Sequence, residues 1–438
     1  MKTPGGKRGG ILILSGVLTL WISGYFHSGL IDLRRTRHLQ QVDPDETTPL
    51  VALTTVAFGG FRGLVADALW IRANKMQEEG QYFEMVQLAR WITQLEPRVP
   101  EVWSFQAWNL AYNISVLFPE FEDRWRWVNH GLDLLRKQGL THNPNSPDLH
   151  WDIGWMFQHK IGMEFDTAHI VYKQKLVAQV EEILPEGRIP ESGRTPELAR
   201  ALKDRFSMQA EDIQSLEDRY GPLDWRLPAT HVLYWSTRGL TYHPDRFDER
   251  RLRRMRMQAL GLLMRGGRMI TLPGHESVWI KVPRLDLMDP VLGEYRSLLR
   301  DNPYNGYLRQ GYTTFLNDAL LMSIQYGNPN RAYELYTELA EVDKEIPPGQ
   351  AAFQNHVQIS LTQNPDTLSA EQASTRIVAL LNQSMQTQDP IRARGLEQMA
   401  AQLHRIYQDS RIGEEHRVRT GLPSLELLKE LVEKSRNP

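Results

Sequence analysis

Apolar positions recur along most of this chain at the spacing of amphipathic helices, about every 3.6 residues. Residues 64–97 show the pattern simply, because an apolar stripe breaks at Gly80, resumes, and stops at Pro97. Glycine favours a tight turn after a helix, and proline cannot continue one. We therefore expect two helices joined at Gly80, and the second should bury these residues: Leu88, Trp91, Ile92 and Leu95.

One stretch departs from this pattern because it is apolar on all sides. From Gly9 to Ile31 the sequence contains no Asp, Glu, Lys or Arg. At about 1.5 Å per residue, such a helix crosses the roughly 30 Å hydrocarbon layer of a membrane. We expect a tail and transmembrane anchor over residues 1–31 and a juxtamembrane linker over 32–47. A cleaved signal peptide and a buried helix are the alternatives, although no small-residue cleavage site stands out near Tyr25–Gly29.

Basic residues flank this apolar run on both sides. Three precede it and three follow it: Lys2, Lys7, Arg8, Arg34, Arg35 and Arg37. The number of basic side chains is therefore equal on the two sides and does not decide the membrane orientation, although the terminal amine adds a small positive excess before the run. A short basic tail before an apolar run is typical of a signal anchor, and long domains after it translocate largely regardless of charge. We expect a single-pass membrane protein with the bulk of the chain outside the cytoplasm, on the periplasmic side.

A second apolar stretch, Leu50–Ile71, is long enough to span a membrane but contains Arg62 and Asp67. Each charge near the centre of a bilayer costs about 2.5–3.5 kcal/mol on insertion scales. A packed soluble helix explains the stretch better than a span, and a re-entrant membrane element is the alternative. We therefore expect a first helical lobe over residues 48–184.

The middle of the chain changes in composition and then in periodicity. Residues 185–222 are charged and poor in aromatics, which predicts a surface loop and exposed helices before a second helical lobe, 223–345. Within that lobe, Met269–Leu272 and Val278–Val282 flank the turn sequence PGHES and predict a small β-hairpin. Residues 346–438 should form C-terminal helices, the clearest of which cover 369–385, 389–408 and 424–435.

Small, aromatic, glycine and proline positions recur within these helix pairs. The positions are Ala73, Gly80, Pro97, Trp103, Ala107, Tyr112, Pro144, Gly327, Ala332 and Tyr336. Their spacing resembles that of the tetratricopeptide-repeat superfamily, which repeats about every 34 residues with a glycine turn and a closing proline. The match is degenerate, because Met85 stands where the family prefers alanine. The resemblance covers 64–180 and 225–345 and implies an all-α fold, an α-solenoid of stacked helix pairs behind the membrane anchor.

Composition narrows the functional classes. The 438-residue chain has a net charge of −2, which argues against broad nucleic-acid binding because that usually needs a basic domain. It has no cysteine, which excludes disulfides and thiolate metal sites. The sequence also lacks phosphate-loop, zincin, nucleophile-elbow and dinucleotide-binding motifs. We expect no cofactor and no nucleic-acid partner, and an enzyme is the less favoured interpretation.

Histidines and aspartates gather between residues 142 and 173, which is one candidate for a site. The polar groove would contain His159, Asp166, His169 and Lys173, the last three on one helical face if the helix is continuous. A metal or acid–base site is one interpretation of this cluster. Helix capping and a surface groove are the other, because the cluster lacks the pair of histidines four positions apart that a metal-binding helix favours.

A basic helix is the second candidate. Arg250, Arg251, Arg253 and Arg254 lie largely opposite an apolar arc, so they offer a docking face for an acidic partner or anionic lipid headgroups. A solvated face neutralised by neighbouring carboxylates is the alternative. Arg256 falls towards the apolar arc instead, and it therefore needs a carboxylate partner or room to reach water.

These expectations together favour a membrane-anchored, tetratricopeptide-like scaffold or accessory subunit that binds unidentified proteins in a cell-envelope complex. Its membrane contact would be residues 9–31. The alternatives are a helical enzyme that uses the 142–173 region and a periplasmic binding module.

Overall fold

A computed structural model describes residues 62–190, 195–272, 279–361, 370–411 and 422–436. The chain divides into two compact units, Met1–Asp67 and Ala68–Pro438. The described residues are mostly helical and contain one two-stranded antiparallel sheet, which confirms the predictions of an all-α fold and of a small hairpin. The predicted anchor at residues 9–31 lies outside the described residues. Within the described part of the chain, no helix has both the length and the apolarity to cross a membrane.

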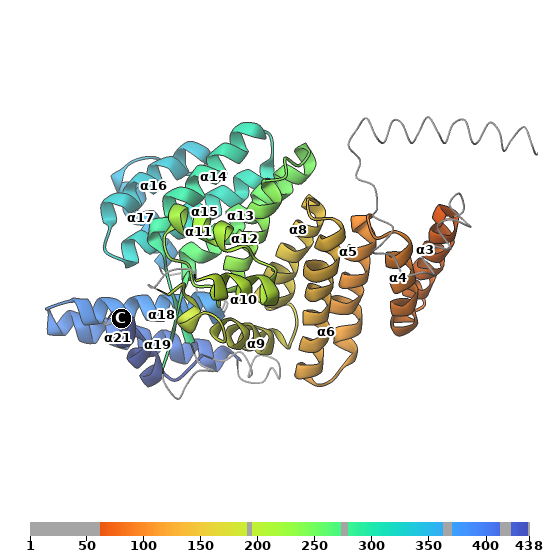
Figure 1. The fold of residues 1–438 in the computed structure, drawn as a ribbon. Coiled ribbons are helices and arrows are strands. Elements are labelled where there is room, and N and C mark those ends of the chain that lie inside the picture. The colour runs from red at the N-terminus through yellow and green to blue at the C-terminus, as the bar shows by residue number, and fades with distance from the viewer. Residues whose placement is uncertain (1–61, 191–194, 273–278, 362–369, 412–421, 437–438) are drawn as a thin grey trace, which may run out of the picture. The chain divides into compact units, whose positions relative to one another are not determined.

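The first half of the described chain contains α-helices, several of which are labelled in Figure 1, together with 3-10 and π-helical segments. In chain order the elements are α3 (Arg62–Glu78), α4 (Tyr82–Leu95), α5 (Pro100–Trp108), η2 (Asn109–Ile114), η3 (Ser115–Leu117), α6 (Phe121–Asp133), η4 (Leu134–Gly139), α7 (Leu140–His142), α8 (Pro147–Trp155), η5 (Met156–Gly162) and α9 (His169–Glu181). Three of them, η2, η4 and η5, are π-helical segments that prolong α5, α6 and α8. The π-helix is rare and is frequently found at functional sites.

The second half contains the hairpin between two groups of helices. The elements are η6 (Pro185–Gly187), α10 (Pro196–Phe206), α11 (Ala210–Tyr220), α12 (Pro228–Leu240), α13 (Arg246–Gly266), β1 (Arg268–Thr271), β2 (Trp279–Val282), η7 (Leu285–Leu287), α14 (Met288–Asp301), α15 (Gly306–Gln325), α16 (Pro329–Val342), α17 (Gln350–Leu361), α18 (Ala370–Gln386), α19 (Pro390–Arg411) and α21 (Leu425–Arg436). The three predicted C-terminal helices correspond to α18, α19 and α21, and α17 is an additional one.

Local sequence signals explain where many helices begin and turn. Six of the described α-helices begin with proline at the first position, where its missing N–H costs no hydrogen bond: α5, α8, α10, α12, α16 and α19. Ser146 caps α8 by accepting a hydrogen bond from the Leu149 N–H. Gly80 and Gly327 follow α3 and α15 with φ angles of 72° and 79°, as their positions in the sequence predict.

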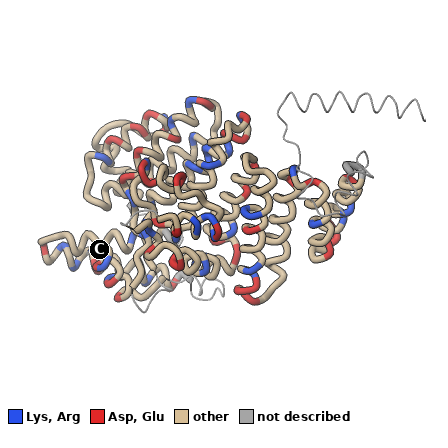
Figure 2. The backbone as a smooth tube through the Cα atoms, viewed as in Figure 1, with Lys and Arg blue, Asp and Glu red and all other residues tan. Residues whose placement is uncertain are grey.

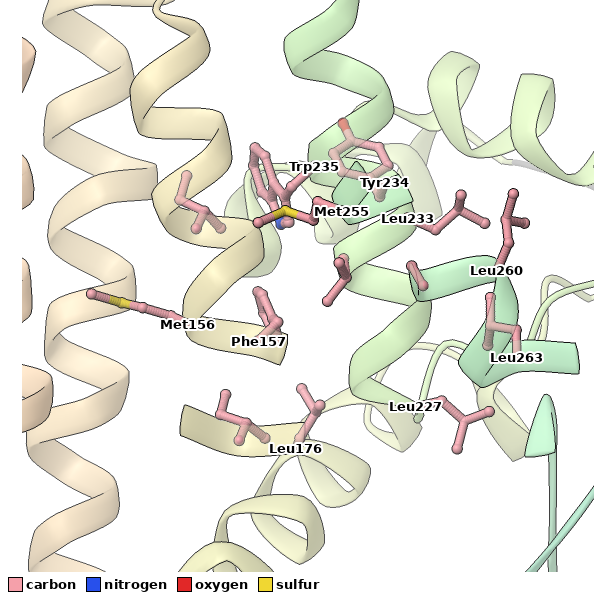
Figure 3. Packing of buried hydrophobic residues seen from close by; sticks show 14 of the residues in the cluster. Met156, Phe157, Leu176, Leu227, Leu233, Tyr234, Trp235, Met255, Leu260 and Leu263 are labelled. Atoms are coloured by element: carbon pink, nitrogen blue, oxygen red, sulfur yellow. The ribbon is translucent and has the colours of Figure 1, made fainter. Parts of the chain in front are cut away.

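One buried core runs through most of the second unit. It extends from Ala73 to Phe353, so successive helices share apolar contacts. Figure 3 shows part of it, where Met255 from α13 lies beside Trp235 from α12 and Phe157 projects from η5. A helix with an apolar stripe cannot bury that stripe alone, and stacking on neighbours therefore supplies the stabilisation.

The prediction for the core face of α4 is partly wrong. Leu88 and Ile92 are buried as expected, but Trp91 is 49% exposed. Met85 and Ala89 are buried in its place. The apolar residues of α4 can be assigned to either of two overlapping helical faces. The face that packs contains Met85, Leu88, Ala89 and Ile92, and the Trp91 indole lies outside it.

The hairpin belongs to a second, smaller core. β1 and β2 pair in antiparallel register, with Ile270 opposite Ile280. Both isoleucines are buried together with apolar residues of α18, α19 and α21. Lys434 near the end of α21 also donates a hydrogen bond from Nζ to the Thr271 carbonyl, at 2.8 Å. The C-terminal helices therefore hold the hairpin in place.

The charged segment before α12 packs as amphipathic helices. α10 buries Leu202 and Phe206, and α11 buries Ile213 and Leu216. Their charged residues lie mostly on the remaining faces, so each helix buries one side although the segment is charged and poor in aromatics.

Candidate functional site

Two neighbouring helices, each continued by a π-helical segment, carry a row of aromatic side chains. α5 and α8 are in contact, and both turn into π-helix, at η2 and η5, close to the aromatic residues. Trp151, Trp155 and His159 are spaced four positions apart, which places them on one side of α8 and η5.

These three rings stack along the helix. The Trp151 and Trp155 centroids are 5.2 Å apart, and those of Trp155 and His159 are 4.9 Å apart, with interplanar angles of 13° and 10°. Phe165, after the π-helical segment, continues the row with its centroid 4.7 Å from that of His159. These separations are in the range of favourable aromatic pairs.

A second pair of rings on α5 and η2 lies beside the first row. Trp108 stacks on Tyr112 at 4.7 Å, and the Tyr112 centroid is 5.8 Å from that of His159. We call the six residues the aromatic strip: Trp108, Tyr112, Trp151, Trp155, His159 and Phe165. Five are half-buried and Phe165 is 69% exposed, so the strip presents ring surface to solvent while its side chains are held by packing.

Asp152 is a buried carboxylate beneath the strip. It accepts hydrogen bonds from Ser104 Oγ and from Trp108 Nε1, the latter at 3.2 Å. Burial raises the Asp152 pKa to about 6, although these two hydrogen bonds and the charge of Arg251 act in the opposite direction. The carboxylate therefore fixes the Trp108 ring, and it carries most of its charge at neutral pH.

The arginine helix α13 joins the strip at one end through Arg251. The Arg251 guanidinium lies over the Trp151 ring, 5.0 Å from its centroid, and also 5.6 Å from that of the exposed Phe247. It forms ion pairs with Asp148 and with Asp248, the second at 2.8 Å. A cation over an aromatic face is attracted by the ring electrons. Arg251 thus connects the predicted docking face to the region of His159.

The other predicted arginines differ in their surroundings. Arg253 bonds to Asp301 and Ser297 of α14, each at 2.7 Å, so its charge is largely matched within the protein. Arg250 is exposed and donates a hydrogen bond from Nε to the Arg246 carbonyl, and Arg254 is exposed. Figure 2 shows basic and acidic positions interspersed on α13 and its neighbours. The four arginines therefore do not form a face of single charge.

Arg256 has the carboxylate partner that its position requires. Its guanidinium is 2.7 Å from Glu294 Oε1, and both side chains are mostly buried. The ion pair joins α13 to α14, which explains how an arginine lies beside the apolar arc of α13.

Asp166 is the centre of a buried polar cluster. Its carboxylate accepts hydrogen bonds from Lys160 at 2.6 Å, from the Tyr172 hydroxyl and the Ala168 N–H at 2.9 Å each, and from Arg124 at 3.2 Å. Burial alone would raise the Asp166 pKa, but these hydrogen bonds hold it below its ordinary value. The carboxylate is saturated with donors, as expected for a structural role.

The four predicted groove residues divide among three surroundings. His159 belongs to the aromatic strip, and Asp166 belongs to the buried cluster. α9 begins at His169, so Asp166 precedes the helix and the expected continuous helical face does not exist. His169 and Lys173 do meet, with Lys173 Nζ 3.1 Å from His169 Nδ1, and both line a cavity of about 170 Å³. Among the described residues, no group of three His, Asp or Glu side chains is arranged to hold a metal ion.

Sequence reasoning missed the strip for two reasons. The four-residue spacing of Trp151 and Trp155 is visible in the sequence, but aromatic residues at helical spacing usually indicate a packed core. Arg251 contacts the strip and pairs with Asp148, which is 103 positions away in the sequence. No local sequence pattern indicates such a contact. Comparison with protein-family models finds no match for this chain, and a search of curated proteins finds no relative.

Proposed function

We propose that this protein is a membrane-anchored scaffold or accessory subunit with tetratricopeptide-like helix pairs, and that it binds a protein partner of a cell-envelope complex. The observation that carries this proposal is the aromatic strip with Arg251 and Phe247 at its end. The proposed anchor is the apolar run of residues 9–31, and the proposed location of the remaining chain is the periplasmic side.

The composition of the strip supports a protein-binding role. Tryptophan, tyrosine and arginine are the residues most enriched among those that dominate binding energy at protein interfaces. Tryptophan and tyrosine supply large contact area at a low cost in side-chain entropy, and their polar groups give direction. In this protein the strip contains tryptophan and tyrosine, Arg251 lies over the Trp151 ring at its end, and Asp148 pairs with Arg251 beside the rings.

The rigidity of the strip supports the same role. Stacking holds Trp151, Trp155 and His159 in one row, and a hydrogen bond holds Trp108. A partner that binds a preformed surface loses less conformational entropy than one that must order it. Burial and the adjacent charge of Lys160 lower the His159 pKa, so its ring is mainly neutral at pH 7 and suited to stacking.

The test is affinity capture from solubilised membranes with the full-length protein and matched variants. We expect the double variant Trp155→Ser, Phe165→Ser to lose at least one protein that the wild type captures. The control is Tyr307→Ser, which removes an aromatic ring that is 91% exposed and lies outside the strip. Circular dichroism of each variant should match the wild type.

Identical capture by the wild type and the strip variant would show that the strip is not the docking surface. Loss of the same proteins from the Tyr307→Ser control would show that the effect is general to exposed aromatic residues. A carbonate wash tests the anchor separately, because a protein held by residues 9–31 stays in the membrane pellet.

A further inference from the structure

A cavity of about 460 Å³ is separate from the aromatic strip. Residues of η4, α7, α8, α10 and α12 line it. Tyr234 and Trp235, which Figure 3 shows on α12, form part of its wall. None of the six strip residues lines this cavity, so binding here goes beyond the proposed protein docking.

Basic side chains outnumber carboxylates around this cavity. Four of the lining residues are basic and one is acidic: Arg136, Lys137, Lys203, Arg238 and Asp204. Arg136 and Lys137 share one carboxylate, that of Asp133, at 2.7 Å and 3.1 Å. Arg238 has its own ion pair with Asp212. Three carboxylates therefore face four cations, which leaves one excess positive charge at the cavity.

Lys203 brings the unmatched charge. Lys203 and Asp204 are exposed neighbours on α10, and neither forms an ion pair in the described part of the chain. Adjacent residues of a helix do not face each other, so Asp204 is not placed to neutralise the Lys203 ammonium. Burial lowers the pKa of His150, which also lines the cavity, from 6.5 to about 4. The imidazole therefore adds no charge at pH 7.

Arg136 contributes a buried guanidinium with unused donors. Its side chain is 3% exposed, and Asp133 accepts a hydrogen bond from Nη2. Nε is buried and has no partner, whereas Nη1 has none among the described residues but is still reached by solvent. Burial lowers the pKa of Arg136, and the charge of Arg205 acts in the same direction, although Asp133 opposes both. One carboxylate thus stabilises this buried charge incompletely.

We propose that this cavity binds a phosphate group, as free phosphate or as a small phosphate monoester. The phosphate oxygens would accept hydrogen bonds from Arg136 Nη1 and from Lys203, and their charge would offset the positive excess. Charge-assisted hydrogen bonds from arginine and lysine are the usual means of holding phosphate. The Ser207 hydroxyl, which lines the cavity without a partner in the described chain, is a further donor.

The test is calorimetric titration of inorganic phosphate and of phenyl phosphate into the full-length protein. The protein is kept in a nonionic detergent, and chloride holds the ionic strength constant. We expect saturable binding of one phosphate per chain and weaker binding of acetate, which has a single charge and two oxygens. Tighter binding of phenyl phosphate than of inorganic phosphate would identify a monoester as the ligand, and the reverse order would identify free phosphate.

Variants of the exposed wall test the charges without disturbing the core. Lys203→Gln should weaken phosphate binding by roughly 3–10-fold. Arg200→Gln is the matched control, because Arg200 is an exposed cation of the same helix that does not line the cavity. Thr141→Glu adds a carboxylate to the wall at an exposed position and should abolish binding, whereas Thr141→Gln, of similar size, should retain it.

Arg136→Gln tests the buried cation and should also abolish binding. If this variant does not fold, the Lys203 and Thr141 variants still decide the question, since both positions are exposed. Four results would each overturn the proposal. They are no phosphate heat above dilution, acetate binding as tight as phosphate, equal losses in Lys203→Gln and Arg200→Gln, and equal binding by the two Thr141 variants.

Discussion

Removal of the Asp166 carboxylate should destabilise the protein more than removal of its lysine partner. The Lys160 side chain is 1% exposed and that of Asp166 is 3% exposed, so neither can reach water. Asp166→Asn leaves the Lys160 ammonium buried without a carboxylate. Breaking a buried pair in this way costs about 3–5 kcal/mol, because one charge stays uncompensated.

The reverse change is less costly because Asp166 keeps other partners. In Lys160→Met the carboxylate still has Arg124 at 3.2 Å and the Tyr172 hydroxyl and Ala168 N–H at 2.9 Å. We expect this variant to lose about 1–3 kcal/mol, the usual cost of one missing polar partner. The double variant should be more stable than Asp166→Asn alone, since it no longer buries an unpaired ammonium.

Urea unfolding of the full-length protein, followed by tryptophan fluorescence, measures these differences. The three variants and the wild type form a double-mutant cycle, which isolates the coupling between the two residues. Two results would contradict the description of the buried ion pair. One is a smaller loss of unfolding free energy in Asp166→Asn than in Lys160→Met. The other is a double variant whose loss equals the sum of the two single losses.

Three other changes test the packing and the electrostatics. Tyr336→Ala removes a ring that is 1% exposed and should cost roughly 3–5 kcal/mol in urea unfolding, and a change near zero would contradict the packing of α16. Arg256→Gln breaks the ion pair with Glu294 and should lower the melting temperature without changing partner capture, whereas changing Arg250 and Arg254 to Gln should hardly affect stability. Burial lowers the His231 pKa from 6.5 to about 3, so its contribution to stability is present above pH 6.5 and is lost as the pH falls towards 3. His231→Gln should therefore flatten the acid side of a stability–pH profile, and an unchanged slope would refute this assignment.

Local signals in the sequence are sufficient to predict many helix ends, the turns after helices and the hairpin. Gly80, Gly327 and Pro97 act through their own backbones, so their effects could be predicted without a structure. The hairpin at Met269–Leu272 followed from a change of period. The exposure of Trp91 was not predictable, because periodicity gives a face but not the neighbour that covers it.

The candidate sites were predicted less well because they depend on contacts between distant segments. Arg256 was expected to need a carboxylate, but only the fold identifies Glu294 as that carboxylate. The sequence indicates Lys173 but not Lys281, which lines the same cavity from a strand more than one hundred positions later. A cavity arises from the packing of several elements, and no single stretch of sequence carries its shape.

The dependence of the hairpin on the C-terminal helices has a consequence for biosynthesis. β1 and β2 bury their isoleucines against α18, α19 and α21, and Lys434 bonds to Thr271. A two-stranded hairpin is marginally stable by itself in water. During translation the strands are made before α18, α19 and α21, so they lack these covering helices until α21 has also been made. A chain truncated before α21 would therefore leave the core around the hairpin incomplete.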